Sequence, residues 1–66
     1  MRYIHFIVNP ISGKGTHNIT LNHLKNFFPE TDFKIAIDYT KYKGHAIDLA
    51  KMALALNASC IVACGG

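Results

Sequence analysis

The chain has 66 residues, of which 50% are apolar and 17% are charged, and it carries a formal net charge of +3. This composition excludes a disordered or coiled-coil chain, and so high an apolar share in so short a chain indicates a piece of a larger globular domain. The lysines are spread along the chain without an arginine-rich run, which argues against a nucleic-acid-binding protein. The amino-terminal apolar run is too short for a signal peptide or a membrane span. We expect a cytoplasmic protein, because the two cysteines are typical of unpaired side chains in a reducing compartment.

The first half of the chain contains a strand pattern followed by a helix pattern. Residues 3–8 are almost continuously apolar and rich in β-branched and aromatic side chains, which predicts a strand covered on both faces. From about residue 16 to residue 28, apolar side chains recur at helical spacing. We expect Ser12 or Thr16 to cap this helix and Pro29 to end it.

The second half repeats the alternation of strand and helix. Residues 33–38 alternate in polarity, which predicts a half-covered strand. Gly44 opens a helical run that Asn57 closes, with Asp48 and Lys51 expected on its solvent face. The apolar stripe expected to face the sheet consists of Ala46, Ile47, Ala50, Ala53 and Leu54.

Residues 58–64 form a third apolar segment, buried in pattern like the first. Cys60 and Cys64 lie four positions apart in it, which on a strand is ~13 Å, beyond the ~7 Å that a disulfide allows. We therefore expect both cysteines to be unpaired, buried side chains in a reducing compartment.

The order β-α-β-α-β with short connections predicts an α/β fold. Right-handed crossovers make the strands parallel and place helices on both faces, giving a three-layer α/β/α fragment of a doubly wound parallel sheet. Strands one and three look covered on both faces, which favours the strand order 2-1-3, although 3-2-1 is also open. Ligands of such sheets bind at the carboxyl ends of the strands, here residues 9–15, 39–44 and 64–66.

The segment VNPISGKGT, residues 8–16, lies between the first strand and the first helix. Gly13 and Gly15 allow positive φ and close approach of an anion, Ser12 can donate a hydrogen bond, and Lys14 adds charge. These properties suit a phosphate-binding loop, and equally a strand-to-helix turn that needs glycine for its geometry. The segment is not a P-loop, because Val8 replaces its first glycine and Gly15 its final Ser or Thr.

Other polar residues leave further interpretations open. Asp38 ends the second strand, where a ribose-binding acid would lie, which supports a Rossmann-like dinucleotide-binding unit, but Asn18 stands where its third glycine belongs. A non-catalytic flavodoxin-like binding domain is another alternative. Taken singly, Thr40 reads as a turn residue, His5 as a satisfied core histidine and His45 as a surface or capping histidine.

The combined pattern resembles the amino-terminal part of the diacylglycerol kinase catalytic domain, as found in bacterial lipid kinases and sphingosine kinases, with an NAD kinase/diacylglycerol kinase-like fold. The resemblance covers essentially the whole chain and rests on Asn9-Pro10-Ile11-Ser12-Gly13, Thr40, Gly44-His45-Ala46 and Gly65-Gly66.

This resemblance implies ATP-dependent phosphorylation of a lipid hydroxyl, with Mg²⁺, in lipid metabolism. It implies that residues 1–66 are the amino-terminal, ATP-binding part of such a domain, ending before its Asp-Gly-Thr segment, so catalytic residues and metal ligands would lie beyond Gly66. We expect the parent protein to bind nucleotide and lipid, with peripheral membrane contact through its remaining part, and the fragment alone to be inactive and to self-associate. The implied ATP-binding residues are Asn9, Pro10, Ile11, Ser12, Gly13, Thr40, Gly65 and Gly66.

Overall fold

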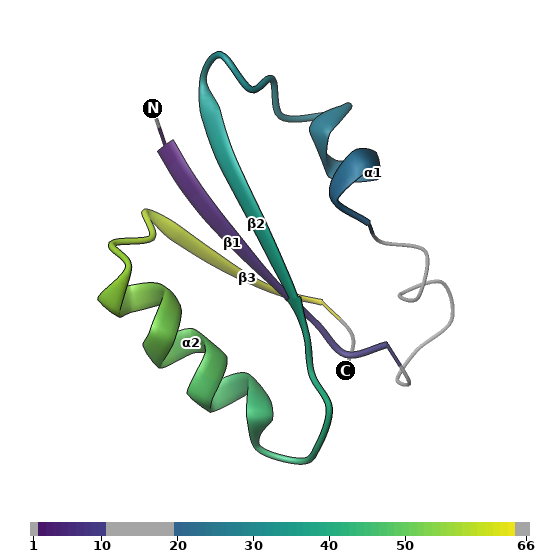
Figure 1. The fold of residues 1–66 in the computed structure, drawn as a ribbon, viewed down its shortest axis with the longest axis vertical. Coiled ribbons are helices and arrows are strands. Elements are labelled where there is room, and N and C mark those ends of the chain that lie inside the picture. Colours follow the sequence, from purple (N-terminus) through teal and green to yellow (C-terminus); the bar gives the residue numbers. More distant parts are fainter. Residues whose placement is uncertain (1, 11–19, 65–66) are drawn as a thin grey trace.

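Three strands and two helices alternate along the part of the chain, residues 2–10 and 20–64, that the computed structural model describes. The order is the predicted β-α-β-α-β (Figure 1). The elements are β1 (Arg2–Val8), α1 (Leu21–Lys25), β2 (Phe33–Tyr39), α2 (His45–Ala55) and β3 (Cys60–Cys64). No helix in these two ranges has the length and apolar character needed to cross a bilayer.

The strands form one parallel sheet in the order β2-β1-β3. This confirms the order 2-1-3 and excludes 3-2-1. β1 is central, and its last residue, Val8, pairs with Tyr39 of β2 and with Cys64 of β3. The three strands therefore end at the same level, which brings the segments that follow them to one edge of the sheet.

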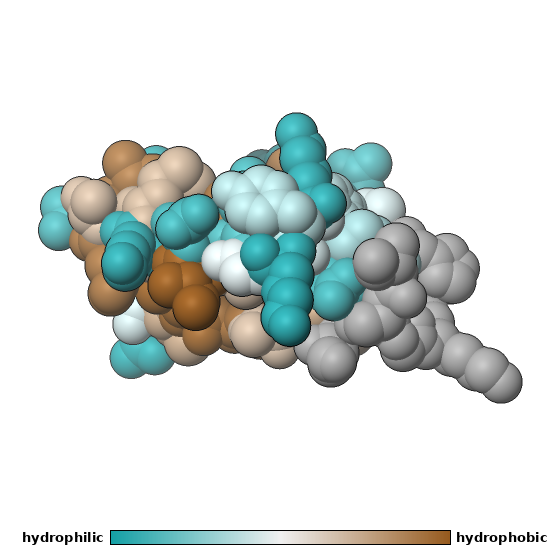
Figure 2. Space-filling view, turned by 90° about the horizontal axis from the view of Figure 1, so that it is seen from below, coloured by the Kyte–Doolittle hydropathy of each residue, from teal (hydrophilic) through white to brown (hydrophobic). Residues whose placement is uncertain are grey.

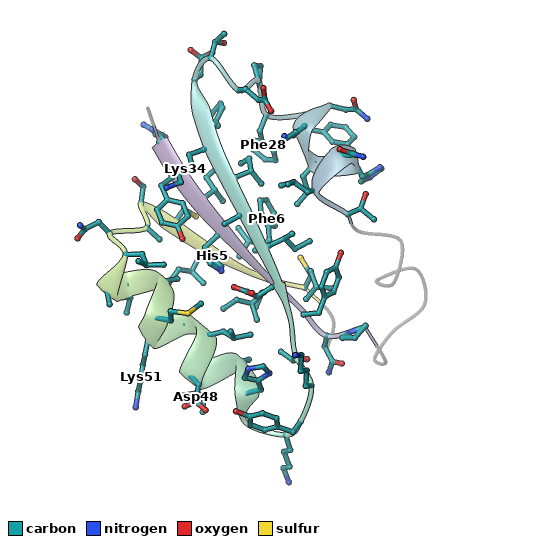
Figure 3. The ribbon with its side chains drawn as sticks, viewed as in Figure 1. His5, Phe6, Phe28, Lys34, Asp48 and Lys51 are labelled. Carbon is teal, nitrogen blue, oxygen red and sulfur yellow. The ribbon has the colours of Figure 1, made fainter. Side chains whose placement is uncertain are left out.

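The helices cover opposite faces of the sheet, which gives the predicted three-layer α/β/α arrangement (Figure 1). Even-numbered side chains of β1 face α1, where Ile4 and Phe6 form a buried cluster with Leu24. Phe28 continues this cluster, with its ring centroid 5.8 Å from that of Phe6 and 5.3 Å from that of Phe33. Figure 3 shows Phe6 and Phe28 on this side and His5 on the other, as the alternation of a strand requires.

The contact between α2 and the sheet differs from the predicted apolar stripe. The buried residues of α2 are Leu49 and Ala53, one turn apart, whereas Ile47 and Leu54 are each 63% exposed. That part of the prediction was wrong, because Ile47 and Leu54 lie at least about 100° round the helix from the buried pair. Figure 2 shows apolar side chains gathered on the α2 side of the molecule. Asp48 and Lys51 are exposed, as predicted.

The first helix is shorter than the sequence pattern indicated. Its N-cap is Thr20, whose side chain accepts a hydrogen bond from the backbone N–H of His23 at 3.2 Å. The prediction that Ser12 or Thr16 caps this helix was therefore wrong, because Thr20, in extended conformation directly before Leu21, is the N-cap of α1. Ser12 and Thr16 themselves lie outside the described residues. After Lys25 the chain tightens, and the N–H groups of residues 27 and 28 both donate to the carbonyl of Leu24.

β3 is less covered than predicted, because it forms an edge of the described sheet. Cys60 is exposed and Cys64 is half-buried. The prediction that both are buried was wrong, while the prediction that they are unpaired is confirmed.

Candidate functional site

The carboxyl ends of the strands hold the residues that follow them in fixed positions. The N–H of Thr40, after β2, donates to the carbonyl of Val8 at 2.8 Å. The N–H of Asn9, after β1, donates to the carbonyl of Cys64 at 2.9 Å. Each of these residues thus extends a parallel ladder by one step, so Asn9 and Thr40 lie at the same edge of the sheet.

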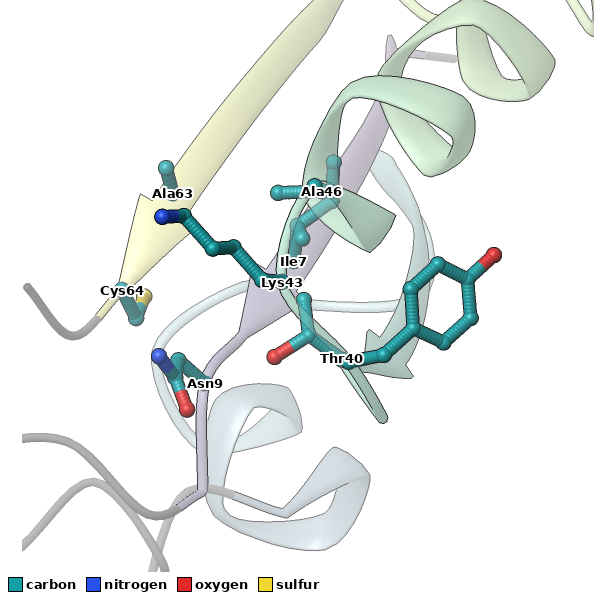
Figure 4. A pocket seen from close by; sticks show the side chains of 9 residues that line it. Ile7, Asn9, Thr40, Lys43, Ala46, Ala63 and Cys64 are labelled. Atoms are coloured by element: carbon teal, nitrogen blue, oxygen red, sulfur yellow. The ribbon is translucent and has the colours of Figure 1, made fainter.

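A hollow of about 300 Å³ lies at this edge (Figure 4). A neighbouring hollow of about 310 Å³ shares four of its lining residues, so the two lie side by side at this edge. In Figure 4 the side chains of Asn9 and Thr40, from neighbouring strands, both border it, and Lys43 extends toward Ala63 of β3. The lining residues of the two hollows together are Ile7, Asn9, Thr40, Lys41, Tyr42, Lys43, Gly44, Ala46, Ala63 and Cys64.

The loop between β2 and α2 folds back on the start of the helix. Gly44 is the N-cap of α2 with φ of +86°, a left-handed conformation that favours glycine. A Cβ built there would meet no atom within 4 Å, so the backbone conformation and not lack of space calls for glycine. The Nδ1 of His45 accepts a hydrogen bond from the N–H of Lys41 at 3.0 Å, which ties the loop to the first residue of α2. This bond is not a helix cap, because Lys41 lies outside the helix and the N-cap of α2 makes no side-chain hydrogen bond.

Tyr42 is a component of this site that the sequence analysis missed. Its ring stacks on that of His45, with centroids 4.3 Å apart and planes 15° apart. Its hydroxyl donates to Oδ2 of Asp48 at 3.3 Å. Desolvation of the hydroxyl, followed by the nearby Asp48 carboxylate, raises the pKa of Tyr42 above its ordinary value. The sequence did contain a signal for Tyr42, namely its position between two lysines just before Gly44-His45, with an aspartate six residues after it.

The lining is positively charged. Among the described lining residues, Lys41 and Lys43 are the charged ones and none is a carboxylate. The hydroxyl of Thr40 and the side-chain amide of Asn9 add hydrogen-bond donors, so the hollow suits an anion with several oxygen atoms.

A magnesium ion does not fit the same lining. Mg²⁺ prefers carboxylate and other oxygen ligands. Within residues 2–10 and 20–64, no group of three or more His, Cys, Asp or Glu side chains is placed to hold a metal ion. The described residues therefore provide no binding site for magnesium.

The eight predicted ATP-binding residues have different outcomes. Asn9 and Thr40 line the hollow together, whereas Pro10 is described but lines neither part of it. The other five, Ile11, Ser12, Gly13, Gly65 and Gly66, lie outside the described residues.

Asp38, the candidate ribose-binding acid, does not line the hollow. Its Oδ2 lies 2.6 Å from Nε2 of His5, a side chain that is only 3% exposed. The prediction of a satisfied core histidine is confirmed, and Asp38 is the carboxylate that satisfies it.

The sequence profile of the diacylglycerol kinase catalytic domain matches residues 3–66. The chain belongs to this family. Searches of curated proteins and of solved structures gave no significant match. Membership of the diacylglycerol kinase catalytic domain family confirms the resemblance stated from the sequence, and it supports a lipid-kinase-like function in general terms.

Proposed function

We propose that the hollow at the carboxyl edge of the sheet binds the phosphate groups of ATP, as part of a kinase that phosphorylates a lipid hydroxyl. The observation that carries this proposal is the meeting of Asn9, Thr40 and Lys43 around one hollow. They come from the ends of two neighbouring strands and from the loop before α2, where open parallel sheets bind their ligands. Membership of the diacylglycerol kinase catalytic domain family supplies the reaction class.

The lining side chains have distinct roles in this proposal. The hydroxyl of Thr40 and the amide of Asn9 donate hydrogen bonds to phosphate oxygens. Lys41 and Lys43 neutralise charge on the triphosphate, and no carboxylate among the described lining residues repels it. Phosphoryl transfer depends mainly on positioning and charge neutralisation, so a site of this composition contributes to it without a covalent intermediate.

The proton of the lipid hydroxyl needs a separate acceptor. During transfer, the bond between the γ-phosphorus and the bridging oxygen breaks, a bond to the lipid oxygen forms, and ADP leaves. None of the described lining residues is a carboxylate or a histidine, so we assign no general base among them. These residues act in nucleotide binding, and the chain by itself is not expected to turn over lipid.

A dinucleotide-binding function has weaker support. It needs Asp38 to accept hydrogen bonds from a ribose beside the bound phosphates, and Asp38 does not line the hollow. The described site therefore favours a triphosphate over a dinucleotide.

Isothermal titration of the chain with ATP tests the proposal. We expect binding that weakens in Lys43→Ala, which removes charge at the hollow, and in Thr40→Val, which removes a donor at nearly constant volume. Lys51→Ala is the matched control, because it removes the same charge from the exposed face of α2 (Figure 3). The proposal fails if the chain does not bind ATP, or if Lys51→Ala weakens binding as much as Lys43→Ala.

A further inference from the structure

Tyr42 is an exposed aromatic residue at the border of the candidate site. It lines both parts of the hollow and is 59% exposed. Lys41 and Lys43 flank it in sequence and line the same space. An aromatic ring between two lysines beside an anion-binding hollow combines the two elements that nucleotide recognition uses, namely a surface for the base and charge for the phosphates.

One face of the Tyr42 ring is already occupied. His45 stacks on it nearly in parallel, at a centroid distance of 4.3 Å. In the described part of the chain, His45 provides the one ring contact of Tyr42. The high exposure of Tyr42 leaves its remaining surface accessible to a flat ligand.

The ring is also held in a fixed orientation. Its hydroxyl donates to Asp48 on the first turn of α2, and the imidazole beneath it is bonded to the N–H of Lys41. These bonds join the loop, the helix and the ring pair. A ring already restrained in this way loses less conformational freedom when a ligand packs on it, which favours binding.

We propose that Tyr42 stacks with the nucleobase of the nucleotide whose phosphates occupy the hollow. This inference rests on the proposed function and adds a base-binding residue to it. Stacking is tolerant of base identity, since every base has a π-face. ATP and GTP should therefore depend on Tyr42 to the same degree.

The experiment compares ATP, GTP and inorganic tripolyphosphate as ligands of the same chain. Affinities are measured by isothermal titration for the wild type, Tyr42→Ala, Tyr42→Phe and Lys43→Ala. Loss of one stacked ring weakens base binding by about fivefold or more. We expect Tyr42→Ala to weaken ATP and GTP by that factor and to leave tripolyphosphate unchanged. Tyr42→Phe keeps the ring and loses only the bond to Asp48, so it should retain most of the nucleotide affinity. Lys43→Ala should weaken all three ligands.

The outcomes separate this inference from the proposed function. If the wild type binds neither ATP nor tripolyphosphate, the proposed function fails. If it binds both and Tyr42→Ala affects neither, or both equally, the stacking inference fails alone. NMR of the wild type decides the case in which Tyr42→Ala does not fold. Ring-current shifts of the Tyr42 ring protons with ATP but not with tripolyphosphate support stacking, and identical shifts with both ligands overturn it.

Discussion

The imidazole of His5 links the buried centre of the sheet to the carboxylate of Asp38 on its β2 edge. Nε2 of His5 lies 2.6 Å from Oδ2 of Asp38, and Nδ1 lies 2.6 Å from the hydroxyl of Tyr3. Since an ionised carboxylate can only accept, Nε2 carries the hydrogen in this pair, and in the neutral ring Nδ1 accepts from Tyr3. The side chain of His5 is only 3% exposed, and both of its ring nitrogens have a hydrogen-bond partner.

Replacing His5 tests the contribution of this network to folding. His5→Ala removes a buried ring together with its hydrogen bonds to Tyr3 and Asp38, so we expect the free energy of unfolding to fall by about 2–4 kcal/mol. Asp38→Asn keeps an oxygen that accepts the same hydrogen bond, so its cost should be smaller, about 1 kcal/mol. Urea denaturation followed by circular dichroism measures both values.

The matched control for this network is His23→Ala, because His23 is exposed on α1. A surface substitution of this kind should change the free energy of unfolding by about 0.5 kcal/mol or less. Equal losses for His5→Ala and His23→Ala would show that the network contributes little to stability.

The contact between α2 and the sheet gives a second prediction. Ala53 is fully buried, whereas Ala55, two residues later, is exposed. Ala53→Leu forces extra volume into a close helix-sheet contact and should destabilise the fold by about 1–3 kcal/mol. Ala55→Leu adds the same side chain on the solvent side and should be nearly neutral. Thermal unfolding of the two variants provides the comparison, and similar melting temperatures would contradict the observed orientation of α2.

Local sequence patterns predicted the order of strands and helices, but they did not predict for every element which side is buried. The parallel pairing followed from the short connections, whereas hydrophobic coverage favoured the order 2-1-3 without excluding 3-2-1, and β3 is less covered than its apolar sequence indicated. The orientation of α2 could not be predicted in this way, because Ile47, Leu49 and Leu54 are all apolar. Packing against β1 and β3 selects which of them is buried. The start of α1 also depended on Thr20, a cap that lies within the pattern taken for helix.

The candidate site divides in a similar way. Asn9 and Thr40 were predictable because each directly follows a strand, and parallel strands end at a common edge. Tyr42 was not, because its position depends on the loop folding back so that His45 and Asp48 hold it. That arrangement joins residues three and six positions apart across a turn, which no periodic pattern encodes.

The left-handed N-cap of α2 gives a third prediction. Gly44 has φ of +86°, so Gly44→Ala places a Cβ in an unfavourable backbone conformation and should cost about 1–2 kcal/mol. Gly44→Asn should cost less, because asparagine enters this region more readily. No atom lies within 4 Å of the added Cβ, so the loss comes from the backbone and not from a clash. The explanation would be contradicted if urea denaturation gave Gly44→Asn a lower free energy of unfolding than Gly44→Ala.

Titration of Tyr42 gives the last prediction. Desolvation and then the Asp48 carboxylate raise its pKa above 10.0, because both disfavour the phenolate. The folded chain thus holds this proton more tightly than the unfolded chain, so the contribution to stability is complete below pH 10.0 and is lost as the pH rises through the raised pKa. The difference in phenolate absorbance between wild type and Tyr42→Phe reports this group among the three tyrosines. Asp48→Asn should move the midpoint part of the way back toward 10.0, since desolvation remains. A midpoint that Asp48→Asn does not change would mean that the carboxylate does not act on the Tyr42 hydroxyl.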